Sequence, residues 1–304
     1  MNAARWLDVS PAEYHALRDD ALTQSLAVEL LQKSPRHARR KQQRRAEPEQ
    51  PHSEEQAEKR RAMDFGTLVH SQLLGGLDDR IELVPDVTDW RTKAAKETKA
   101  RIRAAGRIPV LQKELDRAAS LASHVRRELE AYEIDLSEEP GRRVCERAIE
   151  WRDEGVIARG MFDAIDLPGA IIYDVKTTSD AHPDRFARSA DRMGYDVQAG
   201  AYTRALETLY PRLAGRVRFR WILVEVATAE VVVCEATPSM LHLGGLKWTR
   251  ACRTWAACLA RKHWPGYGGG RIVPIAPSDW AIAAETTARH ESNELAAMVA
   301  PRRA

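Results

Sequence analysis

The stretch GMFDAIDLPGAIIYDVKTTSD (160–180) contains the pattern that decides the fold. It completes a predicted strand at 156–165, turns at Leu-Pro-Gly (167–169), and enters a second predicted strand at 170–177. The second strand begins with a continuous apolar run, which is typical of a strand buried on both faces. The stretch therefore predicts two neighbouring strands, the second of them inside the protein.

Two acids and a lysine interrupt this apolar pattern. Asp174 and Lys176 are two residues apart on one strand, so both side chains leave the same face. Asp163 lies on the preceding strand, and the turn brings it beside Asp174 if the two strands pair. Adjacent carboxylates repel each other and favour a hard divalent cation such as Mg²⁺, which keeps several waters and suits hydrolysis of a phosphate ester. A lysine within reach could position or deprotonate the attacking water, or neutralise transition-state charge.

The overall composition is that of an ordinary globular protein. The chain has 304 residues, 47 Lys and Arg against 44 Asp and Glu, and a net charge of +3, which excludes a disordered chain, a collagen and a small disulfide scaffold. The near-neutral charge argues against a simple polybasic nucleic-acid binder. The N-terminal sequence has no signal-peptide pattern, no apolar run is long enough to span a membrane, and the 4 cysteines form no Cys-x-x-Cys pair. We therefore expect a cytoplasmic protein with no membrane association.

The predicted elements change from helical to mixed along the chain. Residues 39–61 are basic and then rich in Glu, Gln and Pro, so we expect an exposed, mobile loop there. The predicted organisation is an N-terminal helical region (1–143), an α/β core with a mixed central sheet flanked by helices (144–265), and a C-terminal extension (266–304). Helices are predicted at 1–33, 64–75, 90–107, 111–132, 193–210 and 238–262, with Asp64 as the N-cap of the second, and further strands at 144–151, 217–226 and 230–236.

Several segments, in a fixed order along residues 10–265, resemble one known family. This family is the exodeoxyribonuclease VIII (RecE-type) exonuclease branch of the PD-(D/E)xK nuclease superfamily, and so many ordered matches are hard to obtain by chance. The matching segments are SPRHAR (34–39), FGTLVH (65–70), DWRTKAAKETKARIRAAGRIPVL (89–111), CERAIEW (145–151), GMFDAID (160–166), IIYDVKTTSDAHPDRFARS (171–189) and GYDVQAGAY (194–202).

The resemblance implies both a fold and an activity. The fold would be a restriction-endonuclease-like α/β core, and the activity a Mg²⁺-dependent exodeoxyribonuclease, with Mn²⁺ as a substitute metal. It further implies 5′→3′ degradation of linear double-stranded DNA in phage-type homologous recombination. The expected partners are DNA ends, a single-strand annealing recombinase, and further copies of the chain in a ring. The expected setting is a bacterial cytoplasm, with the gene carried by a phage or prophage.

The resemblance also implies roles for individual residues. Asp163, Asp174 and the carbonyl of Val175 would bind the metal, and Lys176 would be the catalytic lysine. His70 would belong to the site as a second-metal ligand or a phosphate contact; the alternative is a helix histidine satisfied in the core.

Further residues are candidates for the same site. Gln198 and Tyr202 are four apart on one helix face and would touch the scissile phosphate or the lysine, unless they only pack. Glu146 could add a carboxylate from the first core strand, and Glu150 is the alternative.

Two basic segments, 33–45 and 91–107, are the expected DNA contacts. Together they contain 14 Lys and Arg with a single acid, and sequence-independent DNA affinity comes from neutralising phosphates. The alternative for each segment is a solvated helix face. The residues chosen from them are Arg36, Arg39, Arg40, Arg91, Lys93 and Lys96.

Other classes of protein remain as rivals. An Asp-x-Lys sequence is common, and by itself it can be an ordinary surface salt bridge. An iron–sulfur nuclease of the CRISPR-associated or helicase-linked type needs four clustered cysteines, but Cys145 lies inside a predicted strand and a Cys-x-x-Cys pair is missing, so no cluster is expected. A catalytically inactive DNA-binding subunit and a phage scaffolding protein both leave the Asp–Asp–Lys set unexplained.

Overall fold

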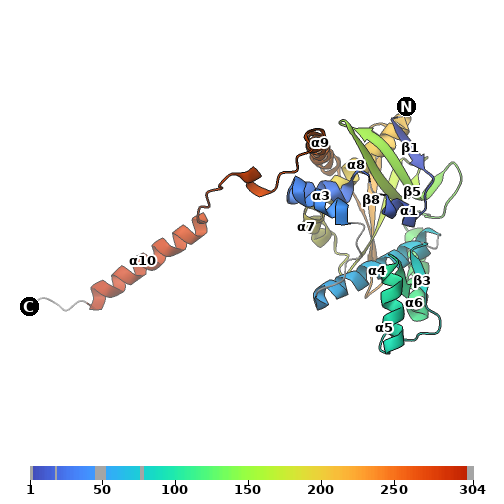
Figure 1. Ribbon diagram of the computed structural model, residues 1–304, viewed down its shortest axis with the longest axis horizontal. Helices are drawn as coiled ribbons and strands as arrows, with labels where there is room; N and C mark the ends of the chain where they lie inside the picture. Colours follow the sequence, from blue (N-terminus) through green and yellow to red (C-terminus); the bar gives the residue numbers. More distant parts are fainter. Residues whose placement is uncertain (1–2, 18, 45–52, 76–78, 300–304) are drawn as a thin grey trace, which may run out of the picture. The chain divides into compact units, whose positions relative to one another are not determined.

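The computed structural model describes residues 3–17, 19–44, 53–75 and 79–299. In this part of the chain a large mixed sheet has the strand order β1-β5-β6-β7-β8-β9, and the short strand β2 pairs with β6 (Figure 1). Its strands are β1 (Ala4–Leu7), β2 (Leu22–Thr23), β5 (Arg143–Asp153), β6 (Val156–Asp166), β7 (Ile171–Thr178), β8 (Arg218–Glu225) and β9 (Val231–Glu235), whereas β3 (Ile81–Leu83) and β4 (Ile108–Val110) form a separate parallel pair.

The strands at the middle of the sheet are buried on both faces. β7 is antiparallel to β6 and parallel to β8, and the apolar residues at its start are buried as the sequence predicts. Along β8 the side chains alternate between two hydrophobic cores. Trp221 and Leu223 face the core that includes α8 and α9, while Ile222 and Val224 face the core that includes α4 and α6.

Helices cover both faces of this sheet, which gives an α/β/α arrangement. None of the helices in the described residues is long and apolar enough to cross a membrane. The helices are α1 (Pro11–Ala16), α2 (Gln24–Gln32), α3 (Pro35–Arg44), α4 (Glu54–Leu74), α5 (Lys93–Ala104), α6 (Gln112–Glu130), α7 (Pro183–Met193), α8 (Tyr195–Leu209), α9 (Pro238–Arg261) and α10 (Asp279–Val299), with 3₁₀ turns at Pro211–Leu213 and Tyr267–Gly270.

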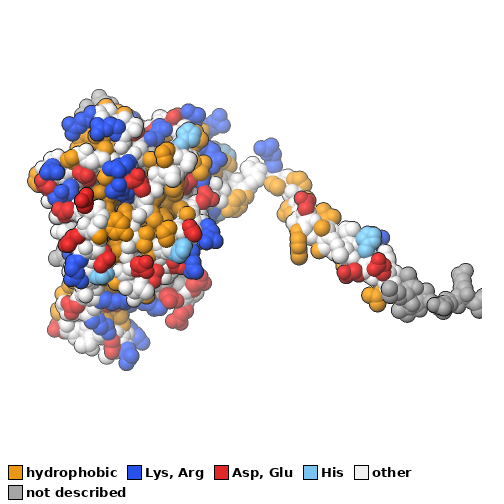
Figure 2. Space-filling model, turned by 180° about the vertical axis from the view of Figure 1, so that it is seen from behind, with side chains coloured by type: hydrophobic (Ala, Val, Ile, Leu, Met, Phe, Trp, Pro, Cys, Tyr) orange, Lys and Arg blue, Asp and Glu red, His pale blue; other side chains and the backbone are white. Residues whose placement is uncertain are grey.

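The chain forms two compact units, Met1–Trp264 and Pro265–Ala304. The first unit contains the whole sheet and both hydrophobic cores. In Figure 2, Lys and Arg side chains are interspersed with Asp and Glu over its visible face, in keeping with the small net charge of +3. The second unit contains α10 and exposes large apolar side chains, among them Ile272, Ile275 and Trp280.

Three expectations for the first half of the chain are wrong. Residues 1–33 are not one helix, because β1 pairs with β5 at the edge of the sheet and a new helix begins after the Ser10 cap. The loop expected at 39–61 is mostly helical, since α3 runs to Arg44 and α4 begins at Glu54; residues 45–52 lie outside the described part of the chain. The N-cap of α4 is Ser53 rather than Asp64, and acids in its first turn favour the positive end of the helix dipole.

Helix α7 was not predicted from the sequence. α7 precedes α8, and a single residue, Gly194, separates the two in a left-handed conformation that ends the first and starts the second. The start signal was present in the sequence as His182-Pro183, with Pro at the first helical position.

Candidate active site

Asp163 lies on β6 and contacts the backbone of the neighbouring strand. β6 and β7 pair with Ala164 opposite Tyr173, so the predicted pairing of these strands is confirmed. The backbone N–H of Val175 donates a hydrogen bond of 2.8 Å to Oδ2 of Asp163. This bond fixes the Asp163 carboxylate at the segment of β7 that contains Asp174.

Asp174 is buried and is held from two directions. Its side chain is only 5% exposed, and Nζ of Lys176 lies against its Oδ2 in an ion pair. Gln198 of α8 donates a hydrogen bond of 2.7 Å from Nε2 to Oδ1 of Asp174. Among the described residues Oδ2 receives no hydrogen bond of good geometry, in spite of the nearby ammonium. The Lys176 ammonium is still the ion-pair partner of this oxygen, and a cation bound here would have to share the oxygen with it or take its place.

The electrostatics of the site are those of two carboxylates next to one ammonium. Burial raises the pKa of Asp174 above its usual 3.8, Lys176 opposes this rise, and the negative charge of Asp163 adds to it. Burial alone would lower the pKa of Lys176, but the attraction of the two carboxylates outweighs it and holds that pKa above 10.5. A divalent cation between the carboxylates would relieve their repulsion.

His70 reaches this site from α4. Its Nε2 donates a hydrogen bond of 2.8 Å to the carbonyl of Val175, the carbonyl proposed as a metal ligand. Its Nδ1 lies 3.6 Å from Oδ2 of Asp163. The helix comes this close because Gly66, one turn earlier, has no side chain: a Cβ there would lie 2.8 Å from Oγ1 of Thr177. The Gly-Thr-x-x-His segment thus places the imidazole beside both strands.

The two candidates on α8 have different surroundings. Gln198 contacts Asp174, one of the proposed metal ligands, rather than the lysine. The Tyr202 hydroxyl accepts a 3.3 Å hydrogen bond from the Met161 N–H, and its ring packs edge-on against Phe162 at 5.0 Å between centroids. Tyr202 therefore packs on β6, and it also lines the cleft described below.

The register between β5 and β6 separates the two glutamate candidates. Cys145 pairs with Ala164 and Arg147 with Phe162, so Glu146 lies across from Asp163. The backbone of Glu146 has a φ of 42°, an uncommon conformation for a residue other than glycine. The side chain of Glu150 is bound by two arginines instead and does not line the cleft. The geometry thus brings Glu146, not Glu150, to the site.

A cleft of about 1700 Å³ opens over His70 and the two paired strands. Its lining includes Glu146, Asp163 and Lys176 from the sheet, together with residues of α1, α3, α4 and the end of α5. Positive charge along the cleft would attract a polyanion such as a nucleic acid. The carboxylates at one wall could hold a metal ion that assists its cleavage. Besides Lys176, the Lys and Arg residues that line it are Lys41, Lys59, Arg60, Arg80, Arg103, Arg107 and Arg159.

The six residues predicted to bind DNA do not line this cleft. Arg39 pairs with Asp20 at 2.6 Å and lies over the ring of Trp264, which makes it part of the packing. The other five are exposed on α3 or around the start of α5, and a role in DNA binding stays a prediction for them; they are Arg36, Arg40, Arg91, Lys93 and Lys96. Sequence reasoning missed Lys59 and Arg60 because their segment was interpreted as a loop.

The cysteines do not gather at the site. They lie on β5, β9 and α9, and burial raises the pKa of every one of them, that of Cys145 to about 11. In the described ranges, no group of three or more His, Cys, Asp or Glu side chains is arranged to hold a metal by itself. A site with two adjacent carboxylates fits Mg²⁺, which is commonly bound through one or two carboxylates with waters and substrate phosphates completing the shell.

A mixed sheet flanked by helices, with Asp163 on one strand and Asp-Val-Lys on the next, defines a PD-(D/E)xK-type core, so the predicted fold class is confirmed. The chain belongs to the family described as "PDDEXK-like domain of unknown function (DUF3799)", whose model matches residues 25–272. The fold is similar to the crystal structure of a "putative exonuclease" from Eubacterium rectale, with a TM-score of 0.56, 14% identity, and coverage of 91% of this chain and 99% of that one. None of the curated proteins matches the chain.

Proposed function

We propose that this protein is a Mg²⁺-dependent deoxyribonuclease that hydrolyses phosphodiester bonds in the cleft. The observation that carries the proposal is the set of Asp163, Asp174 and Lys176 on two paired strands, of which Asp163 and Lys176 line a basic cleft and Asp174 is buried beside them. The family match and the fold support a nuclease, and the Eubacterium rectale protein with a similar fold is itself described as an exonuclease.

The residues present fit a magnesium ion. Asp163 and Asp174 supply adjacent carboxylates, and their mutual repulsion is offset among the described residues by the Lys176 ammonium. Glu146, across from Asp163, is the third carboxylate that could join them. When bound, Mg²⁺ polarises a phosphate oxygen and lowers the pKa of a bound water.

The side chains around the carboxylates have separate tasks. Lys176 is in reach to donate hydrogen bonds to the attacking water or to a phosphate oxygen that gains charge. Gln198 fixes the orientation of the Asp174 carboxylate, as neighbours of metal ligands commonly do. His70 fixes the Val175 carbonyl and lies beside Asp163.

The finer activity that we propose is exonucleolytic. The ordered motif resemblance to the exodeoxyribonuclease VIII family supports 5′→3′ degradation of linear duplex DNA, within phage-type recombination and together with an annealing protein. It also supports a ring of subunits around DNA and the use of Mn²⁺ in place of Mg²⁺. A cytoplasmic setting in a bacterium accompanies this function.

The test uses linear duplex DNA labelled at one 5′ end or one 3′ end, with covalently closed circles as the control substrate. Wild-type protein with Mg²⁺ should release label from the 5′ end first, leave circles intact, and lose activity in EDTA. The Asp174→Ala variant should fold like the wild-type protein but should not degrade DNA. Equal degradation by wild type and variant would refute the site, whereas cutting of circles would refute only the exonuclease assignment.

A further inference from the structure

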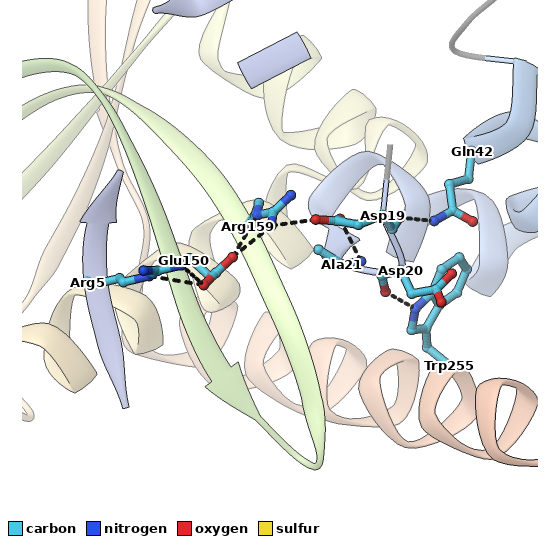
Figure 3. A network of polar contacts seen from close by, with 8 residues as sticks. All are labelled: Arg5, Asp19, Asp20, Ala21, Gln42, Glu150, Arg159 and Trp255. Atoms are coloured by element: carbon cyan, nitrogen blue, oxygen red, sulfur yellow. Dashed lines mark hydrogen bonds and ion pairs between the residues drawn. The ribbon is translucent and has the colours of Figure 1, made fainter. Parts of the chain in front are cut away.

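A network of charges links the edge of the cleft to the sheet (Figure 3). Arg159 lies on β6 on the same strand face as Asp163, because the two are four residues apart. At about 3.3 Å per residue, the two side chains start about 13 Å from each other along the strand. Both line the cleft. A nucleic-acid strand that places its scissile phosphate at Asp163 can therefore pass Arg159 with a phosphate further along.

Two carboxylates hold the guanidinium of Arg159 in different ways. Oε2 of Glu150 accepts from both Nε and Nη2, at 2.9 and 2.8 Å, and Glu150 is 15% exposed. Oδ2 of Asp19 lies 2.5 Å from Nη2, and the Asp19 side chain is 48% exposed. The Asp19 carboxylate is therefore the partner that can leave, while Glu150 keeps the arginine in place.

The backbone at Asp19 is held firmly, so the carboxylate leaves the arginine by a side-chain rotation, which also strains or breaks its 3.0 Å hydrogen bond from the Ala21 N–H. The Asp19 carbonyl accepts a hydrogen bond from Gln42, and the next carbonyl, that of Asp20, accepts one of 2.9 Å from Trp255. Directly afterwards the chain enters β2, where Thr23 pairs with Arg159. The cradle around the guanidinium thus stays in position when the carboxylate moves.

The charge balance of the network fits an anion in place of the Asp19 carboxylate. Arg5 contacts the other oxygen of Glu150 at 2.8 and 3.1 Å, so the pair Arg5–Glu150 is already neutral. This leaves Arg159 and Asp19 as the second neutral pair. A phosphodiester carries one negative charge, so replacing the carboxylate by a phosphate preserves the balance. A guanidinium also binds phosphate well.

Resting on the proposed nuclease function, we propose that Arg159 binds a backbone phosphate of the substrate, and that Asp19 occupies this phosphate position when nucleic acid is absent. The Arg159 side chain is only 12% exposed while Asp19 covers it. The substrate strand must displace the carboxylate to reach the arginine. Asp19 thus lowers the affinity for nucleic acid and neutralises Arg159 until the substrate arrives.

The test compares Asp19→Asn with Asp20→Asn in the full chain. Both variants remove one negative charge at neighbouring positions, but Asp20 pairs with Arg39 and does not line the cleft. Asparagine at position 19 can still accept the local hydrogen bond from the Ala21 N–H, so the turn is preserved. Binding of fluorescein-labelled single-stranded and duplex DNA is measured by anisotropy in EDTA, which keeps the DNA intact.

The expected result is that Asp19→Asn binds DNA about two- to fivefold more tightly than Asp20→Asn, the gain expected from removing a partly exposed ion pair. In an Arg159→Gln background the Asp19 change should give no gain. Arg159→Gln alone should also remove about one phosphate contact. The slope of log affinity against log salt concentration should therefore become shallower by about 0.7–0.9. A merely structural ion pair would instead give lower thermal stability with unchanged affinity.

The outcomes separate the two proposals. If wild-type protein binds DNA and the two Asn variants bind it equally, the exchange at Arg159 is refuted and the nuclease function stands. If wild-type protein neither binds nor cuts DNA, both proposals are refuted.

Discussion

Gly244 of α9 gives the sharpest test of how the fold positions the site. α8 and α9 approach so closely that a Cβ on Gly244 would lie 1.8 Å from the backbone carbonyl oxygen of Asp196 and 2.6 Å from its carbonyl carbon. An ordinary contact needs about 3.4 Å, so Gly244→Ala must move the two helices apart by about 1.6 Å. The neighbouring Gly245 is a matched control, because a Cβ there meets nothing within 4 Å.

The two substitutions should change stability in opposite directions. Alanine favours a helix interior by up to about 1 kcal/mol over glycine, so Gly245→Ala should be neutral or stabilising. Gly244→Ala has the same gain in helix propensity, but its new Cβ overlaps the backbone of α8. Relieving this overlap costs about 3 kcal/mol or more. The net loss of about 2 kcal/mol corresponds to a Tm lower by about 4–8 °C in a unit of this size.

The same displacement should reach the active site. α8 carries Gln198, and its 2.7 Å hydrogen bond to Asp174 lies within one turn of the overlap. Gly244→Ala should therefore lower nuclease activity at temperatures where the protein is still folded, while Gly245→Ala should not. Thermal unfolding by circular dichroism and initial cleavage rates measure both effects. Equal Tm values for the two variants would refute the close packing of α8 on α9.

Three further outcomes are expected. Lys59→Gln, in the cleft, should weaken DNA binding and reduce the log–log salt slope by about 0.7–0.9, while Lys113→Gln, exposed on α6 outside the cleft, should not; equal effects would contradict the path through the cleft. Burial favours a higher pKa for the Glu150 carboxyl, but hydrogen bonds from two arginines outweigh it and hold this pKa below 4.5. The stabilisation by Glu150 is therefore present above pH 4.5 and is lost as the pH falls through the lower pKa of the folded state. Urea unfolding should show Glu150→Gln less stable by about 1–3 kcal/mol at pH 7, with a difference that narrows in acid. Gln198→Ala should lower kcat about 10- to 100-fold at temperatures where the variant is still folded, because it frees the Asp174 carboxylate to turn; an unchanged kcat would remove Gln198 from the site.

The pairing of the two central strands could be predicted because its causes are local. A short turn at Pro168-Gly169 joins the strands, and alternation along a strand puts Asp174 and Lys176 on one face. The α/β class followed from the alternation of strand and helix patterns. Each of these features depends on residues close together in the sequence.

The remaining parts of the site depend on contacts between distant residues. Whether Glu146 or Glu150 faces Asp163 is set by the register of β5 on β6, which apolar patterning alone does not determine. The link from Asp19 to Arg159 joins residues 140 positions apart, and nothing in either local sequence indicates it. The basic residues of α4 that line the cleft were not predicted, because a charge-rich helix has the amino-acid composition of a loop.

The most direct measurement of the central claim compares Asp163→Asn with Asp166→Asn in Mg²⁺-dependent cleavage of linear DNA. Both changes replace one carboxylate on β6 by an amide of the same shape, but only Asp163 lines the cleft and accepts the hydrogen bond from β7. We predict that Asp163→Asn abolishes cleavage and that Asp166→Asn keeps the wild-type rate. Cleavage by Asp163→Asn at the wild-type rate would contradict a metal site at these carboxylates.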